Sequence, residues 1–213
     1  MLETKHRRIG VFIDVQNMYY SARSLYGSKV NFHNIVKSGI GDAQLIRAIA
    51  YGITTKGKEE TAFFEALHSV GIEVMTKELL EYESGHKKGD WDVGIAIDIV
   101  RLCDMVDVIV LVSGDGDYVP VGDYVKGRGR IFHVMSFRES TSSRLVECAD
   151  IYTNLSDQHD RYLIGSGNGK PRGPKKGEAS IDPTSVEDEA DADQAVVITD
   201  DEHKRPRRFA RRG

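Results

Sequence analysis

The chain has 213 residues, and 29 lysine and arginine side chains against 33 aspartate and glutamate side chains give it a net charge of −4. An apolar fraction of 40% is enough for one well-formed core, and no apolar run approaches the ~20 residues that a membrane span needs. No hydrophobic signal segment occurs in the first eight residues, and Cys103 and Cys148 lack a metal-type spacing. We therefore expect a cytoplasmic protein with reduced thiols rather than a membrane protein or a disulfide-stabilised secreted one.

Strand and helix patterns alternate along residues 1–164. The strands are short apolar runs rich in β-branched residues, and the helices carry apolar residues at three- and four-residue spacing. In chain order we predict strand 9–13, helices 18–25 and 32–37, strand 43–51, helix 59–70, strand 72–76, helix 90–104, strand 106–112, helix 119–127, strand 131–135, helix 142–148 and a short strand near 151–152. Repeated units of this length predict an α/β fold, a three-layer sandwich around a mainly parallel sheet of about five strands.

The composition changes sharply after about Ile164. A segment rich in glycine, proline and lysine leads into the acidic block 187–193 and then into the basic end 204–212. Only the run 195–198 could bury much apolar surface, so we expect a folded domain over 1–164 and a disordered charged tail over 165–213. The tail is a candidate contact for RNA phosphates or for a protein partner.

Carboxylates follow two of the predicted strands. Asp14 ends the first strand and Asn17 comes one turn later, while Ser113, Asp115 and Asp117 follow the strand 106–112. Ligands of open α/β sheets bind at the carboxyl ends of the strands. If these two strands are neighbours, about 4.8 Å apart, Asp14 and Asp115 face each other across a gap suited to a divalent cation.

A third acidic element opens the helix 90–104. Asp90 fits the N-cap position and Asp92 the first turn, and helix capping alone would explain both. Asp98 lies about 120° around the helix from Asp92, so the two are not expected to contact one ion. We expect Asp98 to orient a neighbour or to pair with Arg101 or a lysine, and we assign Asp90 and Asp98 to the surroundings of the site.

Three segments together, 12–17, 88–98 and 113–118, resemble the NYN domain, and within that family the LabA-like bacterial group. The resemblance spans about residues 8–155 and implies a PIN-like nuclease fold with an acidic cluster at the carboxyl edge of the sheet. It implies a metal-dependent ribonuclease that uses Mg²⁺ or Mn²⁺. Carried over by motif, the catalytic and metal-binding residues are Asp14, Asp92, Asp115 and Asp117, and the polar pocket residues are Asn17 and Ser113.

A domain with net negative charge needs local basic surface to bind a nucleic acid. The candidates that adjoin the predicted site, in the sequence or at the same sheet edge, are Lys87, Lys88, Arg138 and Arg144. Any single one of them could equally be a solvated surface charge.

The leading hypothesis is a metal-dependent endoribonuclease that acts on single-stranded RNA. The alternative is a non-catalytic PIN-like module that binds RNA or a regulatory protein, and a homo-oligomer is possible in either case. A phosphohydrolase of the haloacid-dehalogenase type is disfavoured because the sequence Asp14-Val15-Gln16 lacks the second aspartate of an Asp-x-Asp pair.

Overall fold

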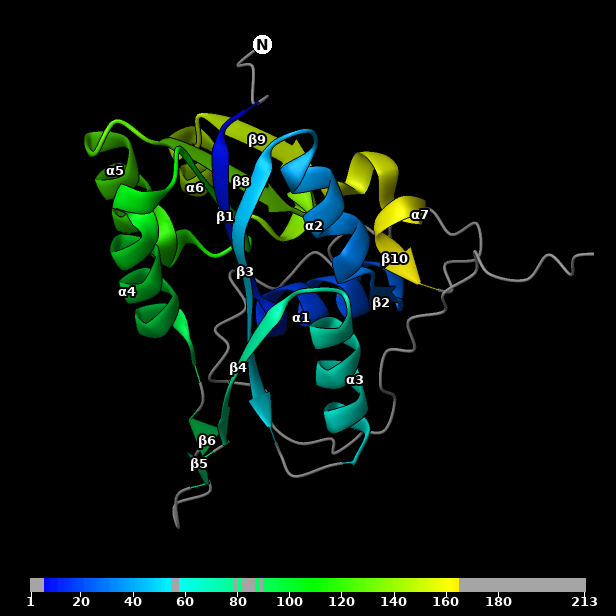
Figure 1. The fold of residues 1–213 in the computed structure, drawn as a ribbon. Coiled ribbons are helices and arrows are strands. Elements are labelled where there is room, and N and C mark those ends of the chain that lie inside the picture. Colours follow the sequence, from blue (N-terminus) through cyan, green and yellow to red (C-terminus); the bar gives the residue numbers. More distant parts are fainter. Residues whose placement is uncertain (1–5, 55–57, 79, 82–86, 89, 165–213) are drawn as a thin grey trace, which may run out of the picture.

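A central parallel sheet of six strands organises the molecule (Figure 1). The computed structural model describes residues 6–54, 58–78, 80–81, 87–88 and 90–164. Every neighbouring pair of strands in the sheet is parallel. The order across the sheet is β4 (Glu73–Glu78), β3 (Gln44–Thr54), β1 (Arg8–Asp14), β7 (Val108–Val112), β8 (Ile131–Ser136) and β9 (Ile151–Asn154).

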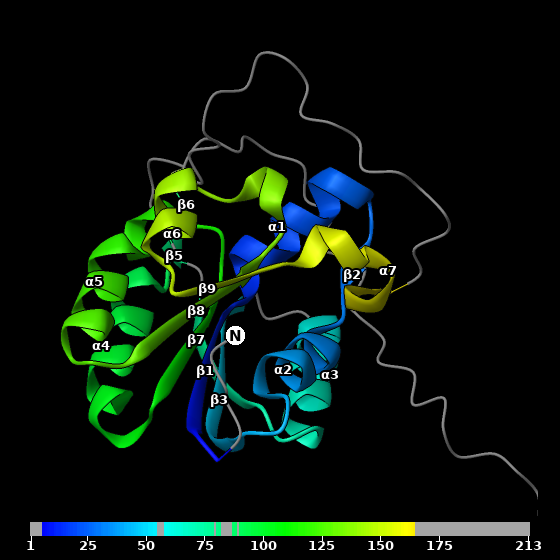
Figure 2. The ribbon, with the colours of Figure 1, turned by 90° about the horizontal axis from the view of Figure 1, so that it is seen from above.

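Helices cover both faces of this sheet, as Figure 2 shows. One face packs against α1 (Val15–Tyr26), α2 (Phe32–Ile40) and α3 (Lys58–Ser69). The other packs against α4 (Asp92–Leu102), α5 (Val119–Gly127) and α6 (Ser143–Cys148). The predicted three-layer α/β sandwich is therefore confirmed. None of the helices in the described part of the chain combines the length and the apolar character that crossing a bilayer requires.

Two hydrophobic cores lie on the two sides of the sheet. Along β7, Val108, Val110 and Val112 face the α1–α3 side, whereas Ile109 and Leu111 face the α4–α6 side. All five side chains are fully buried. This explains why the sequence of β7 is a continuous apolar run and not an alternation of apolar and polar residues.

The strand order reverses at β1. The chain passes from β1 to β3 and β4 on one side of β1, and β7, β8 and β9 lie on the other. The expected pairing of the first strand with the strand that precedes the Asp115 loop is confirmed, since Ile13 lies opposite Val112 in the register. Asp14 and Ser113 thus leave neighbouring strands at the same edge, at the topological switch point where such folds bind ligands.

Several local predictions need correction. The short strand predicted near 151–152 is confirmed as Ile151–Asn154, and because it pairs with β8 the sheet has six strands where we expected about five. Helix α4 begins at Asp92, its N-cap is Trp91, and no side chain caps it, so the prediction that Asp90 is the N-cap is wrong. The expected helix ending at residue 104 instead stops at Leu102 and continues as a 3₁₀ turn, η1 (Cys103–Met105).

Short elements complete the described fold. Two antiparallel pairs of two-residue strands were not predicted, because so few residues carry no periodicity. They are β2 (Lys29–Val30) with β10 (Leu163–Ile164) and β5 (Leu80–Glu81) with β6 (Lys87–Lys88). Helix α7 (His159–Tyr162) follows the 3₁₀ turn η4 (Leu155–Gln158), and two further turns are η2 (Gly116–Tyr118) and η3 (Arg138–Ser140). The predicted tail, 165–213, lies outside the described residues.

An ion pair joins β1 to the segment before β7 at the opposite edge of the sheet. The carboxylate of Asp107 accepts hydrogen bonds from the backbone N–H of Arg8 at 2.9 Å and from Nη2 of Arg8 at 2.9 Å. These hydrogen bonds hold the pKa of Asp107 at about 2. Because this pKa is lower in the folded state, the stabilisation is complete above pH ~4 and is lost as the pH falls towards 2.

We predict that Asp107→Asn lowers the free energy of unfolding at pH 7 by about 1 kcal/mol. The difference from the parent protein should shrink as the pH falls from 4 to 2. Urea denaturation across this pH range measures both effects. Asp42→Asn, at an exposed carboxylate, is the matched control, and an equally large loss of stability in that variant would contradict the assignment.

Candidate metal centre at the carboxyl edge of the sheet

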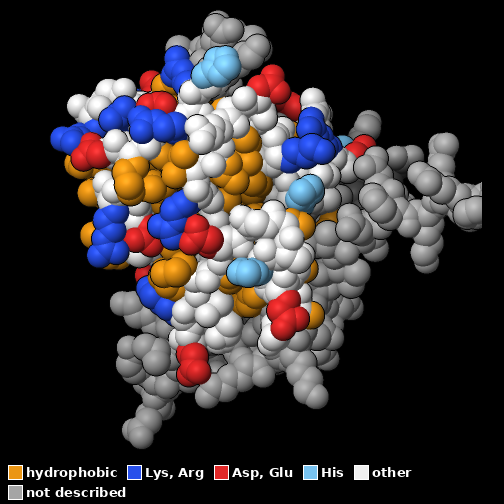
Figure 3. Space-filling model, in the orientation of Figure 1, with side chains coloured by type: hydrophobic (Ala, Val, Ile, Leu, Met, Phe, Trp, Pro, Cys, Tyr) orange, Lys and Arg blue, Asp and Glu red, His pale blue; other side chains and the backbone are white. Residues whose placement is uncertain are grey.

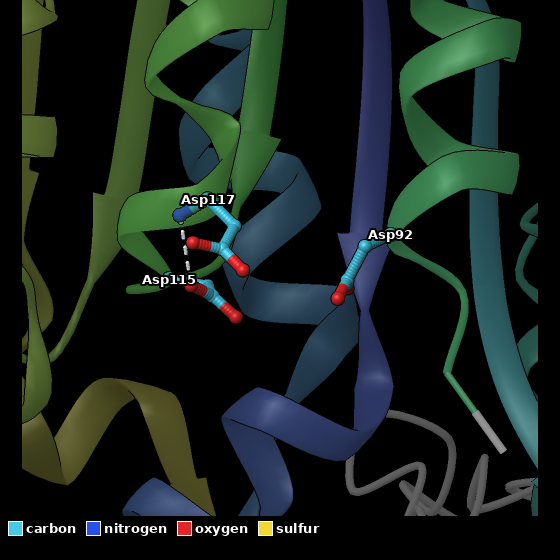
Figure 4. A group of neighbouring side chains, drawn as sticks. All are labelled: Asp92, Asp115 and Asp117. Carbon is cyan, nitrogen blue, oxygen red and sulfur yellow. Dashed lines mark hydrogen bonds between the residues drawn. The ribbon is translucent and has the colours of Figure 1, made fainter. Parts of the chain in front are cut away.

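Three carboxylates converge at the switch point. One oxygen of each of Asp92, Asp115 and Asp117 lies within 4.8 Å of the others. Figure 4 shows Asp92 at the start of α4, facing Asp115 and Asp117 on the loop and turn that follow β7. Asp117 is exposed and the other two are half-buried, so the cluster opens to solvent.

Hydrogen bonds from backbone N–H groups to side-chain oxygens shape the loop after β7. The side chain of Asp115 accepts from the backbone N–H of Asp117 at 2.9 Å, and Oγ of Ser113 accepts from the N–H of Asp115 at 3.2 Å. Oδ1 of Asn17 accepts from the N–H of Gly114 at 2.9 Å, which ties the loop to α1. A Cβ atom on Gly114 would lie 2.8 Å from the backbone oxygen of Ser140, so this packing requires glycine.

The indole of Trp91 places the start of α4. Its Nε1 donates to the backbone oxygen of Gly52 on β3 at 2.8 Å. The ammonium of Lys77 lies 4.0 Å from the ring centroid and donates to the backbone oxygen of Asp90 at 3.1 Å. The side chain of Trp91 therefore fixes the position from which Asp92 reaches the cluster.

Asp14 lies behind the three clustered carboxylates. Its side chain is only 7% exposed. Oδ1 accepts from the backbone N–H of Asn17 at 3.0 Å, while Oδ2 accepts from Oγ of Ser113 at 3.3 Å and from the hydroxyl of Tyr118 at 3.4 Å. Asp14 is not among the carboxylates that lie within 4.8 Å of one another, so the structure brings three of the four predicted ligands together.

The hydroxyl of Tyr118 connects the buried and exposed carboxylates. Tyr118 is 1% exposed, and its hydroxyl lies 3.0 Å from Oδ1 of Asp92 as well as 3.4 Å from Asp14. Sequence reasoning included Tyr118 in a motif but assigned it no role. The one feature of the sequence that could have pointed to Tyr118 is its position three residues after Asp115. In the structure Tyr118 is the last residue of η2.

The site concentrates negative charge. Burial raises the pKa of Asp14 to about 7, and the nearby charges of Asp92 and Asp115 act in the same direction. Burial likewise raises the pKa of Asp92 above its ordinary value. A bound cation would relieve this repulsion. Because the clustered ligands are all carboxylates, the donor set fits a hard divalent ion such as Mg²⁺ or Mn²⁺ better than a thiophilic metal.

Comparison with known proteins agrees with this geometry. The model of the NYN domain family matches residues 8–156, which is most of the chain. The chain belongs to the NYN domain family. A curated relative, the low amplitude and bright protein LabA of Synechococcus elongatus, is 27% identical over 158 residues, which are 70% of this chain and 84% of the relative.

A solved structure shares the fold of this NYN domain. It is the crystal structure of a protein of unknown function from Vibrio parahaemolyticus, with a TM-score of 0.69 and 32% sequence identity. The match covers 77% of this chain and all of the other. Membership places the protein in a PIN-like nuclease family, and the acidic cluster is the part of this NYN domain that could hold a metal ion.

The predicted pocket residues of the NYN domain hold the loop in place. We predicted Ser113 as a polar pocket residue, but its side chain is 0% exposed and its hydroxyl is bonded to Asp14 and to the N–H of Asp115, so it does not line an open pocket. The carboxamide oxygen of Asn17 is likewise occupied by Gly114. The motif identified both residues, and in the structure both side chains hold the loop that carries Asp115.

The two residues expected near the cluster lie outside it. Asp98 accepts from the hydroxyl of Tyr51 at 3.1 Å and pairs with Arg101 at 3.1 Å, as expected for a residue that does not share an ion with Asp92. Asp90 is exposed, and its backbone oxygen accepts from Lys77. Asp90 therefore helps to anchor the segment before α4 through its backbone.

The predicted basic residues of the NYN domain lie on three elements. Arg138 in η3 and Arg144 on α6 are exposed. Lys87 and Lys88 form β6, and their side chains lie outside the description. Ser142 N–H donates to the backbone oxygen of Gly114 at 2.9 Å, so the segment between η3 and α6 contacts the cluster loop.

We predict that Asp14→Asn stabilises the metal-free protein at alkaline pH. A carboxyl whose pKa is about 7 when folded and about 4 when unfolded destabilises the fold as it ionises. The free energy of unfolding of the variant minus that of the parent should rise between pH 4 and 7, by at most ~1.4 kcal/mol per pH unit. Denaturation with a chelator present measures this difference, and an unchanged pH dependence would contradict the burial of Asp14.

We also predict that Tyr118→Phe weakens divalent-ion binding about 10- to 100-fold, the usual cost of losing a group that orients a metal ligand. Phenylalanine keeps the ring in the core but removes the hydrogen bond to Asp92. Titration calorimetry with Mn²⁺ tests this prediction. Tyr124→Phe, at an exposed tyrosine of α5, should bind like the parent, and unchanged affinity in Tyr118→Phe would show that its hydroxyl does not orient Asp92.

Proposed function

We propose that this NYN domain is a metal-dependent endoribonuclease that hydrolyses phosphodiester bonds of single-stranded RNA. The observation that carries the proposal is the convergence of Asp92, Asp115 and Asp117 at the switch point of a PIN-like nuclease fold. No other group of three or more histidine, cysteine or acidic side chains with this spacing was found among the described residues.

Asp92, Asp115 and Asp117 would hold Mg²⁺ or Mn²⁺. When bound, such an ion would neutralise the negative charge that develops on the phosphate and would lower the pKa of a water molecule bound to it. The protein's own contribution is to keep the three carboxylates in one place. Hydrogen bonds from Tyr118 to Asp92 and from the N–H of Asp117 to Asp115 do so before any substrate arrives.

The exposure of the cluster supports internal cleavage. Asp117 is exposed, while Asp92 and Asp115 are half-buried beside it. A long chain can approach such a site sideways, and the ribose–phosphate backbone of an unpaired strand is flexible enough to present one phosphate to the three carboxylates. We therefore propose that cleavage needs no free RNA end.

Basic side chains around the cluster would hold the neighbouring phosphates. Arg138 and Arg144 are exposed on a segment that contacts the loop of Asp115, and β6, formed by Lys87 and Lys88, precedes α4 in the chain. Phosphate contacts of this kind add affinity without sequence preference. We propose that they bind RNA on both sides of the scissile bond, in the cytoplasm.

We predict that Asp115→Asn reduces the rate of RNA cleavage at least about 100-fold, the usual cost of one electrostatic group at a reacting centre. The folded state should persist, since the amide keeps an oxygen that can accept from Asp117. The assay follows a labelled single-stranded RNA with Mn²⁺ or Mg²⁺, and with a chelator. A circular RNA of the same sequence tests for internal cleavage, and a duplex tests the preference for single strands.

The matched control is Asp123→Asn. This carboxylate is exposed on α5, pairs with Lys126 at 3.5 Å and is not among the three clustered carboxylates. The Asp123→Asn variant should cleave RNA at the rate of the parent protein. Cleavage that survives Asp115→Asn would refute the proposed site. RNA binding by the parent protein without metal-dependent cleavage would favour a non-catalytic binding module.

A further inference from the structure

Helix α4 is apolar on two opposite faces. The inner face packs on the sheet through Ile95, Ile99 and Leu102. The outer face carries Val93, Ile97 and Val100 at four- and three-residue spacing, and these side chains are 71%, 46% and 38% exposed. A helix of a folded domain usually has one apolar face, the one that packs on the core, so a second apolar face is typical of a helix that is covered on that side as well. Within the described residues, only the inner face is covered.

Two more side chains widen this surface. Met105 in η1 and Tyr124 on α5 are exposed, and with the three residues of α4 they form what we call the outer α4 face. It contains five of the eight large hydrophobic side chains that are exposed in the described part of the chain, so they are clustered, not scattered. Figure 3 shows orange side chains over the α4 and α5 region, with charged residues between and around them. Clustering of this kind marks an interaction surface.

The charges beside the outer α4 face are balanced. Arg101 pairs with Asp98, and Arg128 pairs with Asp104. A surface whose arginines are already neutralised by carboxylates offers little attraction to RNA phosphates. The same balance lets two identical surfaces meet without repulsion, whereas an excess of one sign would oppose self-association.

We infer that two copies of this chain pack through the outer α4 face, with their α4 helices antiparallel about a two-fold axis near Ile97. Ile97 is the middle residue of Asp92–Leu102, so an antiparallel pair centred there overlaps along the whole helix. Antiparallel packing places the positive end of each helix dipole, at the start of α4, beside the negative end of the other, at its last turn.

The composition of the face favours a second copy over the chain's own tail. The apolar run 195–198 has only four residues, whereas the outer α4 face extends along two turns of α4 and onto η1 and α5. A second α4 is as long as the first and is apolar at matching positions. The inference is independent of whether the acidic cluster cleaves RNA.

The test is the mass of the full-length protein in solution. Light scattering across a dilution series should give twice the 23.7 kDa chain mass for the parent protein. Ile97→Glu and, separately, Val93→Glu should each abolish the dimer, because they bury an unpaired carboxylate in the contact. Ala62→Glu, the same acid at an exposed position of α3 on the opposite side of the sheet, should remain dimeric.

Cysteine crosslinking tests the axis. In Ile97→Cys the two introduced thiols meet across the two-fold axis, and an added oxidant that takes up their two electrons and two protons should join them as a covalent dimer. Ala62→Cys should not crosslink. A parent protein that stays monomeric at every concentration, or a dimer that survives both Ile97→Glu and Val93→Glu, would overturn the inference.

Discussion

The pairing of β1 with β7 is the constraint on which the rest of the structure depends. Because these two strands are parallel neighbours, Asp14 and the loop that begins at Ser113 leave the sheet side by side. The reversal of strand order at β1 leaves this edge open above them. Helix α4 packs on the adjacent part of the sheet and brings Asp92 to the same place. Remote parts of the sequence thus meet through one strand pairing.

Burial divides the acidic residues into two groups. Asp14 is enclosed by the N–H of Asn17 and the hydroxyls of Ser113 and Tyr118, so it acts as the centre of a hydrogen-bonded scaffold. Asp117, at the other extreme, is exposed. A buried carboxylate behind an exposed cluster adds negative potential to the site without occupying it. The fold therefore stores electrostatic repulsion that a cation can relieve.

Helix α4 connects the two surfaces that we interpret functionally. Its first residue belongs to the acidic cluster, and its outer face carries the exposed apolar side chains. The position of this helix is set by Trp91, which reaches β3 through its indole N–H. A second copy bound to the outer α4 face would therefore contact the same helix that positions Asp92. The acidic cluster and the outer α4 face are physically connected through α4.

The sequence by itself determined the α/β class, the order of strands and helices, and three motifs that contain the acidic residues. These are local properties: β7 is apolar because both of its faces are buried, and Asp14 is the last residue of β1, where the chain leaves the sheet. Tertiary structure alone decided that Asp14 lies behind the cluster, that Ser113 is inaccessible, and that Trp91 and not Asp90 precedes α4. Each of these depends on partners far away in the chain, such as Tyr118 for Asp14 and Gly52 for Trp91. Burial and hydrogen bonding between remote segments leave no periodicity in the sequence from which they could be predicted.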